Sequence, residues 1–201
     1  SRQEVLECAG TRYTYSPNLL AFQEGIKQKK KSLAFVGTPC QVQAMRRIQV
    51  ASLKKYADPL NLAIGLMCTE CFDYEGLMKK HIEKEMGISL SAIKKVNIKA
   101  KLLVTTKSGE EKIIPLKEAK QYTRKSCTLC TDFSAELADI SAGGLGMSDW
   151  TFTILRTRRG EGLFEKAEKK GVLRTKPVED EEEKRALDLL VKLSKRKRET
   201  G

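Results

Sequence analysis

The segment LAFVGTPCQVQA (residues 33–44) joins a short apolar run directly to a helical segment, and the choice of fold class starts there. SLAFVG (32–37) is apolar, short and ended by glycine, which indicates a buried strand. CQVQAMRRIQV (40–50) is typical of the helix that would follow it. A buried strand that leads straight into a helix is one βα unit of a parallel sheet.

A second unit of the same kind follows along the chain. LNLAIGLMC (60–68) is another buried apolar run, and DYEGLMKKHIEKEMG (73–87) is an amphipathic helix with Gly87 as its C-cap. A helix over residues 16–31, which begins at Ser-Pro, precedes the first strand. Two such units predict an α/β domain with parallel strands.

The pattern changes after residue 92. Residues 93–116 alternate in places and turn at 107–110, which predicts a β-hairpin or a small antiparallel sheet. The remaining predicted elements are a loop, short helix, strand and glycine-rich loop (124–150), a strand (151–157), a helix ended by glycine and followed by a short strand (162–178), and a C-terminal helix (179–199). The fold class is therefore α/β (α+β), with a mixed sheet, an antiparallel hairpin insertion and a C-terminal helix. We expect one domain over 1–178, followed by a helix and basic tail over 179–201.

Composition sets broad limits on the class of protein. Hydrophobic residues make up 40% of the 201 residues, as in ordinary globular domains, and no apolar run reaches the ~20 residues of a membrane span. No secretory signal pattern opens the chain, so we expect a cytoplasmic protein. The opening SRQEVLECAG has no Met and enters folded-looking sequence at once, so we expect a region that precedes it in the full protein.

The net charge of +12 has two interpretations. A lysine-rich solvated surface explains it, and so does attraction to an anionic partner or cofactor. Aromatic residues are only 6% of the chain and do not interleave with the basic runs at 27–31 and 192–201. This argues against single-stranded nucleic acid, which is bound by stacking on aromatic side chains.

The six cysteines point to a metal or redox site. They are Cys8, Cys40, Cys68, Cys71, Cys127 and Cys130. A reducing compartment makes disulfides rare, so such cysteines are candidate metal ligands or redox thiols. Cys8 also fits a small buried apolar side chain. Cys40 and Cys68 each follow a predicted parallel strand. If those two strands are neighbours, they lie about 5 Å apart, and both thiols can face one pocket.

Two CxxC pairs extend this pattern. CTEC (68–71) and CTLC (127–130) are too far apart in sequence for a common zinc ribbon. A zinc ion, an iron–sulfur cluster and a redox dithiol all remain open for these residues. The turn GTPCQVQ (37–43) can present backbone N–H groups to phosphate, although its spacing alone favours an ordinary βα turn.

Five blocks together resemble the coenzyme F420-reducing hydrogenase/dehydrogenase beta-subunit family. They are AGTRYTYSPNLLA (9–21), FVGTPCQVQAMR (35–46), GLMCTECFDYEGL (65–77), RKSCTLCTDFSAELADISAGGLG (124–146) and WTFTILRTRRGEGL (150–163). The resemblance implies an archaeal electron-transfer module with FAD and a 4Fe-4S cluster, which is a subunit of hydrogenase, dehydrogenase or reductase complexes. It also implies hydride transfer between coenzyme F420 and FAD, followed by single-electron exchange with the cluster and partner redox subunits.

The resemblance also implies roles for particular residues. The cluster ligands are expected to be Cys40, Cys68, Cys127 and Cys130, with Cys71 as the alternative to Cys40. The FAD contacts are expected to include Gly37, Thr38 and Gln41, together with Ser16, Ser141 and Thr151. Arg124 and Lys125 are assigned from their position instead: they stand immediately before the CTLC pair, in a loop close to where electrons enter or leave. They are expected to hold FAD phosphate or the anionic tail of coenzyme F420, and the alternative is that they only solvate this loop. No side chain is assigned as catalytic, because the flavin supplies the chemistry.

Two alternatives remain open on the sequence. The same module could use ferredoxin or NAD(P)H in place of coenzyme F420. A zinc-stabilised basic binding module without redox activity would also account for the cysteines and the charge.

Overall fold

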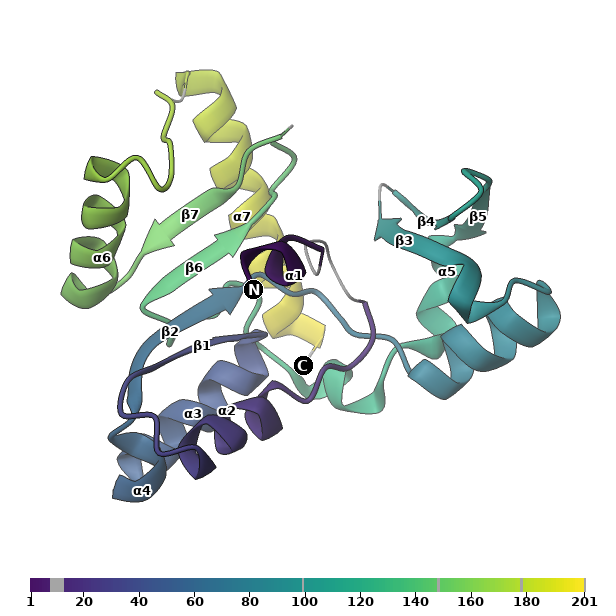
Figure 1. Ribbon diagram of the computed structural model, residues 1–201. Helices are drawn as coiled ribbons and strands as arrows, with labels where there is room; N and C mark the ends of the chain where they lie inside the picture. Colours follow the sequence, from purple (N-terminus) through teal and green to yellow (C-terminus); the bar gives the residue numbers. More distant parts are fainter. Residues whose placement is uncertain (8–12, 99, 148, 178, 201) are drawn as a thin grey trace. The chain divides into compact units, whose positions relative to one another are not determined.

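The computed structural model describes residues 1–7, 13–98, 100–147, 149–177 and 179–200 (Figure 1). Cys8 lies outside the described residues. The chain divides into two compact units. The α/β unit contains residues 17–69 and 129–201, and the antiparallel unit contains residues 1–16 and 70–128.

A four-stranded mixed sheet forms the centre of the α/β unit. Its strands are β1 (Leu33–Gly37), β2 (Leu60–Leu66), β6 (Ile140–Gly143) and β7 (Phe152–Leu155), in the order β1-β2-β6-β7. β1, β2 and β6 run parallel, and β7 is antiparallel to β6. This confirms the predicted fold class and makes the first two predicted strands direct neighbours.

Helices pack around this sheet. They are α2 (Asn18–Lys27), α3 (Pro39–Val50), α4 (Lys54–Ala57), α6 (Arg158–Lys169) and α7 (Asp180–Thr200). Figure 1 shows α2, α3 and α4 near β1, and α6 beside β7. The core between them contains Phe22, Phe35, Val42, Met45, Leu60, Ala63, Ala135 and Ala138. Alternation of buried and exposed positions along β1 explains why this strand turns Phe35 inward.

The prediction of a short strand after Gly171 is wrong, because residues 172–177 form no strand. The backbone N–H of Val172 donates to the carbonyl of Ala167 and closes the end of α6. Gly171 has a φ of +67°, which suits this type of helix end. Over the described part of the chain, no helix combines the length and the apolar character needed to cross a membrane.

The antiparallel unit contains the predicted hairpin region as a three-stranded sheet. Its strands are β3 (Ile93–Ile98), β4 (Lys101–Thr106) and β5 (Glu111–Pro115), paired in the order β3-β4-β5. The turn at 107–110 is where the sequence predicts it, with Gly109 at a φ of +90°. Leu102, Val104 and Ile114 point into the core, whereas Ile113 is 54% exposed. Residues 93–116 are therefore amphipathic at the period of a strand.

The helical elements of this unit are mostly short. They are α1 (Arg2–Glu7), η1 (Tyr74–Glu85), η2 (Leu90–Ala92), α5 (Leu116–Ala119), η3 (Lys120–Tyr122) and η4 (Lys125–Leu129). η1 has the hydrogen-bond pattern of a π-helix, and the Asp73 side chain caps it by accepting from the N–H of Gly76 at 2.7 Å. The core of this unit contains Phe72, Leu77, Ile82, Ile88, Leu102, Val104, Ile114 and Ala119.

A buried carboxylate connects three elements of the α/β unit. Oδ2 of Asp139 accepts a hydrogen bond from the Ala63 N–H in β2 at 2.8 Å, and Oδ1 accepts from the Thr157 hydroxyl at 2.9 Å. The Arg46 guanidinium on α3 lies 3.0 Å from Oδ2. Burial by itself raises the pKa of the Asp139 carboxyl, but these hydrogen bonds and the arginine together hold that pKa below its ordinary value.

We expect Asp139→Asn to lower the free energy of unfolding by about 3 kcal/mol, because it leaves the Arg46 charge without its buried partner. Urea denaturation measures the change. The lowered folded pKa means that the contribution of the carboxylate is present at neutral pH and is lost as the pH falls through that lowered pKa. The difference between variant and parent should therefore shrink in acid.

Asp188→Asn removes the same charge from an exposed position on α7 and serves as the control. It should leave the free energy of unfolding within about 0.5 kcal/mol of the parent. Equal stability of the two variants at pH 7 would contradict the role given to Asp139.

Candidate functional site

Two cysteines follow neighbouring strands at the same edge of the α/β sheet. In the register of β1 and β2, Gly37 pairs with Gly65, and both Cys40 and Cys68 lie three residues further along. Because the strands are parallel, their carboxyl ends meet at one edge, where ligands usually bind in this type of sheet. The strands before Cys40 and Cys68 are neighbours, which is the condition on which the sequence analysis based a shared pocket, and the shared pocket itself stays a prediction.

A third cysteine belongs to a segment at the same edge. The backbone N–H of Cys68 donates to the carbonyl of Phe133 at 2.9 Å, which holds the segment after Cys130 against the end of β2. The Cys130 thiol points to the carbonyl of Asp132 at 3.6 Å. The Asp132 carboxylate in turn accepts from the Gln43 amide at 3.3 Å, one turn after Cys40 on α3. The α/β unit therefore brings three cysteine-bearing segments together.

The other two cysteines interact within the antiparallel unit. The backbone N–H of Cys71 donates to the Cys127 sulfur at 3.3 Å, and the N–H of Arg124 donates to the Cys71 carbonyl at 3.0 Å. An N–H group aimed at a sulfur stabilises negative charge on it, which is a common arrangement around ligating thiolates. The choice between Cys40 and Cys71 as the fourth ligand remains a prediction.

The donor set consists of cysteine thiols, which can hold either zinc or an iron–sulfur cluster. Among the residues that the structure describes, no group of three or more His, Cys, Asp or Glu side chains is placed to hold one metal ion. Cysteine thiolates are the ordinary ligands of iron–sulfur clusters, and in a 4Fe-4S cluster each of the four irons takes one thiolate. The residues present therefore fit a 4Fe-4S cluster chemically.

The turn between β1 and α3 is built around Gly37 and Gln41. The side-chain carbonyl of Gln41 accepts from the Thr38 backbone N–H at 3.0 Å, which caps the start of the helix. A Cβ on Gly37 would lie 2.6 Å from the Phe35 ring and 3.0 Å from Oε1 of Gln41. Gly37 and Gln41 therefore shape the turn, and Thr38 is half-buried at the helix start. Their predicted contacts with FAD remain predictions.

The three weaker flavin candidates lie in different surroundings. Ser141 is fully buried in β6, where its hydroxyl donates to the Ala135 carbonyl at 3.1 Å and accepts from Nε of Arg156 at 2.7 Å. Thr151 is exposed just before β7. Ser16 is exposed in the antiparallel unit. Ser141 therefore holds the α/β unit together locally, and flavin contacts of all three remain predictions.

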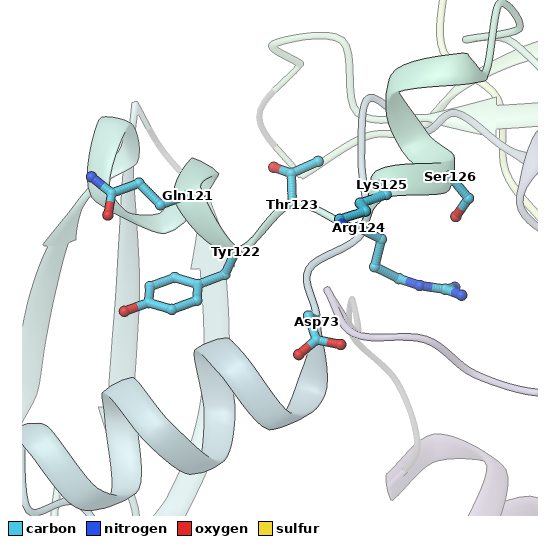
Figure 2. A pocket seen from close by; sticks show the side chains of 7 residues that line it. All are labelled: Asp73, Gln121, Tyr122, Thr123, Arg124, Lys125 and Ser126. Atoms are coloured by element: carbon cyan, nitrogen blue, oxygen red, sulfur yellow. The ribbon is translucent and has the colours of Figure 1, made fainter.

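A pocket of about 530 Å³ lies in the antiparallel unit beside the predicted anion-binding residues (Figure 2). Its lining residues are Asp73, Gln121, Tyr122, Thr123, Arg124, Lys125 and Ser126. Figure 2 shows the Arg124 side chain pointing away from Tyr122, with Asp73 at the start of η1. Arg124 and Lys125 thus border a space large enough for part of a nucleotide or deazaflavin.

The ring of Tyr15 packs against Arg124, one of the residues that line this pocket. The Arg124 guanidinium lies over the Tyr15 ring at 4.6 Å from its centroid. A stacked guanidinium keeps its N–H donors at its edge, where they can meet an anion. Sequence reasoning missed Tyr15, together with Asp73 and residues 121–123. Tyr15 lies inside one of the five family blocks, but nothing local indicates that its ring meets a residue more than 100 positions away.

Comparisons with known proteins find a matching family model and similar proteins. Residues 30–181 match the family model described as coenzyme F420 hydrogenase/dehydrogenase, C terminus of the beta subunit. The chain is 40% identical over 200 residues to the coenzyme F420 hydrogenase subunit beta of Methanococcus voltae, covering 98% of this chain and 70% of that protein. It is 32% identical to the coenzyme F420-dependent sulfite reductase of Methanocaldococcus jannaschii, covering 85% of this chain and 29% of that protein.

A solved structure is also similar. A chain of the F420-reducing [NiFe] hydrogenase complex from Methanosarcina barkeri matches with a TM-score of 0.88 at 34% identity. The match covers 100% of this chain and 69% of that chain.

We expect Gly37→Ala to lower the free energy of unfolding by about 1–3 kcal/mol, because the added methyl group overlaps the Phe35 ring and pushes on the capping Gln41. Thermal or urea denaturation measures the loss. Gly144→Ala is the matched control, since a Cβ there meets no atom within 4 Å. A Gly37→Ala protein as stable as the Gly144→Ala protein would show that this turn has more room than described.

Proposed function

The chain belongs to the coenzyme F420 hydrogenase/dehydrogenase beta-subunit family, and from that premise we propose that it is the flavin and iron–sulfur module of an F420-linked oxidoreductase. Its relatives carry the names of hydrogenase, dehydrogenase and reductase subunits, so the chain is an oxidoreductase subunit that works with other redox subunits. When bound, FAD and a 4Fe-4S cluster would supply the exchange between a hydride of coenzyme F420 and single electrons.

One observation carries the cofactor part of the proposal. Cys40 and Cys68 follow adjacent parallel strands, and the Cys130 segment is hydrogen-bonded to the end of the second strand. Cys127 is only three residues before Cys130, so the chain itself keeps the two Cα atoms within about 11 Å. These residues are the expected thiolate ligands, and the start of α3 at Thr38 offers a helix N-terminus beside them for the phosphates of FAD.

Arg124 and Lys125 have a separate part in the proposal. They border the pocket of the antiparallel unit, and both are cations at neutral pH. We assign them to phosphate of FAD or to the phosphate and glutamate carboxylates of coenzyme F420, because both cations make charge-assisted hydrogen bonds to such groups and the Arg124 guanidinium can make paired ones.

We expect Cys130→Ser and Cys127→Ser each to lose most bound iron and sulfide, because removing one thiolate weakens a four-thiolate site. Iron and sulfide per chain are measured in protein purified without oxygen. Cys40→Ser and Cys71→Ser then separate the two ligand sets, since only one of them should behave like Cys130→Ser. The other variant provides the control for loss of a thiol outside the site.

Full iron and sulfide content in both Cys127→Ser and Cys130→Ser would contradict the ligand assignment. A colourless parent protein that contains zinc and no iron would instead support a zinc-stabilised module. If the parent is active and reduces NAD⁺ or ferredoxin but not coenzyme F420, the assigned substrate is wrong and the assigned cofactors are retained.

We expect the double variant Arg124→Glu/Lys125→Glu to raise the KM for coenzyme F420 by about tenfold or more, or to lower FAD content, while iron content persists. The reason is that two charge-assisted contacts are replaced by repulsion of the anion. The KM is measured for reduction of coenzyme F420 with an artificial electron donor at two salt concentrations, because the loss should be larger at low ionic strength.

Lys94→Glu/Lys95→Glu makes the same change of charge at two exposed residues of β3 in the same unit. This control should keep the parent KM and FAD content. If both double variants behave like the parent at both salt concentrations, Arg124 and Lys125 only solvate their loop.

A further inference from the structure

A lysine occupies the inward face of the C-terminal helix. Ala186, Leu190, Leu193 and Lys197 follow one another at helical spacing along α7, which places them on one face. Ala186 is 2% exposed and Lys197 is 8% exposed. An apolar residue would be the ordinary choice at the last of these positions, because burial of an ammonium group costs free energy unless it is well paired.

The buried ammonium reaches the turn that carries Cys68. Nζ of Lys197 donates a hydrogen bond to the carbonyl of Thr69, the residue after Cys68. On the other side of this turn, the Cys68 N–H donates to Phe133. The end of β2 is therefore held between the 133 segment and the last turns of α7.

The next residue of α7 makes a second contact. Nη2 of Arg198 lies 2.6 Å from Oε1 of Glu136, whose own N–H donates to the Asp132 carboxylate. Both side chains of this pair are largely exposed, so the pair contributes little to stability. The Lys197–Thr69 hydrogen bond is stronger than the Arg198–Glu136 pair, because it is shielded from water and its donor is a charged group.

We propose that Lys197 is a positioning residue for the redox site: it holds the turn after Cys68 and keeps a buried positive charge beside the bound cluster. The inference rests on the cluster named under the proposed function. A cluster with four thiolates is anionic and gains negative charge on reduction, so a nearby ammonium stabilises the reduced state more than the oxidised state. Lys197 thereby makes the reduction potential less negative.

Nearly all of α7 lies beyond the residues that match the family model, which ends at residue 181. The lysine therefore comes from a helix outside the matched segment, although the turn that it holds lies inside it. Lys197 belongs to the basic run at 192–201, which by its sequence resembles solvated surface. The contact with Thr69 assigns a structural role to this one lysine of the run.

The test compares Lys197→Met with Lys197→Arg and with Arg198→Met in the full chain. Hydrogen–deuterium exchange is measured first on the iron-free protein, for the amides of residues 67–69. Lys197→Met should exchange roughly tenfold faster than the parent there, because a hydrogen bond from a charged donor is lost. Arg198→Met should exchange like the parent, and circular dichroism verifies that each variant is folded.

The second measurement is the reduction potential of the iron-loaded protein. Lys197→Met should shift it to more negative values, Lys197→Arg should restore it toward the parent, and Arg198→Met should leave it unchanged. The assignment is overturned if Lys197→Met keeps the parent exchange rate at residues 67–69, or if its potential equals that of the parent. If the parent binds no cluster, the proposed function fails, while the exchange measurement still decides whether Lys197 holds the turn.

Discussion

The buried carboxylate of Asp139 is the interaction on which the α/β unit depends most. It accepts hydrogen bonds from β2 and from the N-cap residue of α6, and it pairs with Arg46 on α3. Its backbone carbonyl also accepts from Arg156, which leads into α6. A Cβ on Gly160 would come within 2.3 Å of that carbonyl, so α6 can approach only because residue 160 is glycine. One side chain thus fixes the positions of a strand and two helices.

The contacts of Asp139 also help to fix the elements that carry the cysteines of the candidate site. Asp139 immediately precedes β6, which pairs with β2, and β2 ends at the turn that carries Cys68. α3 is held by Arg46 at its middle and begins with the turn that presents Cys40. The thiols of Cys40 and Cys68 therefore follow elements that pack into the core, which suits the role of cluster ligands that we propose for them.

The positive charge of the chain has several distinct uses in the structure. Arg46 neutralises a buried carboxylate, and Arg156 ties Ser134 to Ser141 inside the α/β unit. Lys197 is buried at the end of β2, and Arg124 is stacked on Tyr15 beside a pocket. The basic residues behind the net charge of +12 therefore have structural roles besides keeping the surface solvated. Composition alone does not distinguish the residues in structural roles from those that are only solvated.

The sequence by itself determined the local elements of this protein. Apolar runs at 32–37 and 60–68 predicted β1 and β2, and the turn at 107–110 predicted the antiparallel sheet, because strand and turn preferences depend on neighbouring residues. Local preference failed after Gly171, where the Val172 N–H closes a helix instead of joining a sheet. It also had no means of detecting the π-helical pattern of η1.

Only the tertiary structure decided which distant side chains meet. Arg46 and Asp139, Arg124 and Tyr15, and Lys197 and Thr69 are pairs of residues far apart along the chain. Each pair forms because the folded strands and helices bring two distant segments together. The residue pattern within a single segment does not show which other segment it will contact. The cysteine spacing predicted a metal or redox site, while the parallel register of β1 and β2 decided that Cys40 and Cys68 share one edge.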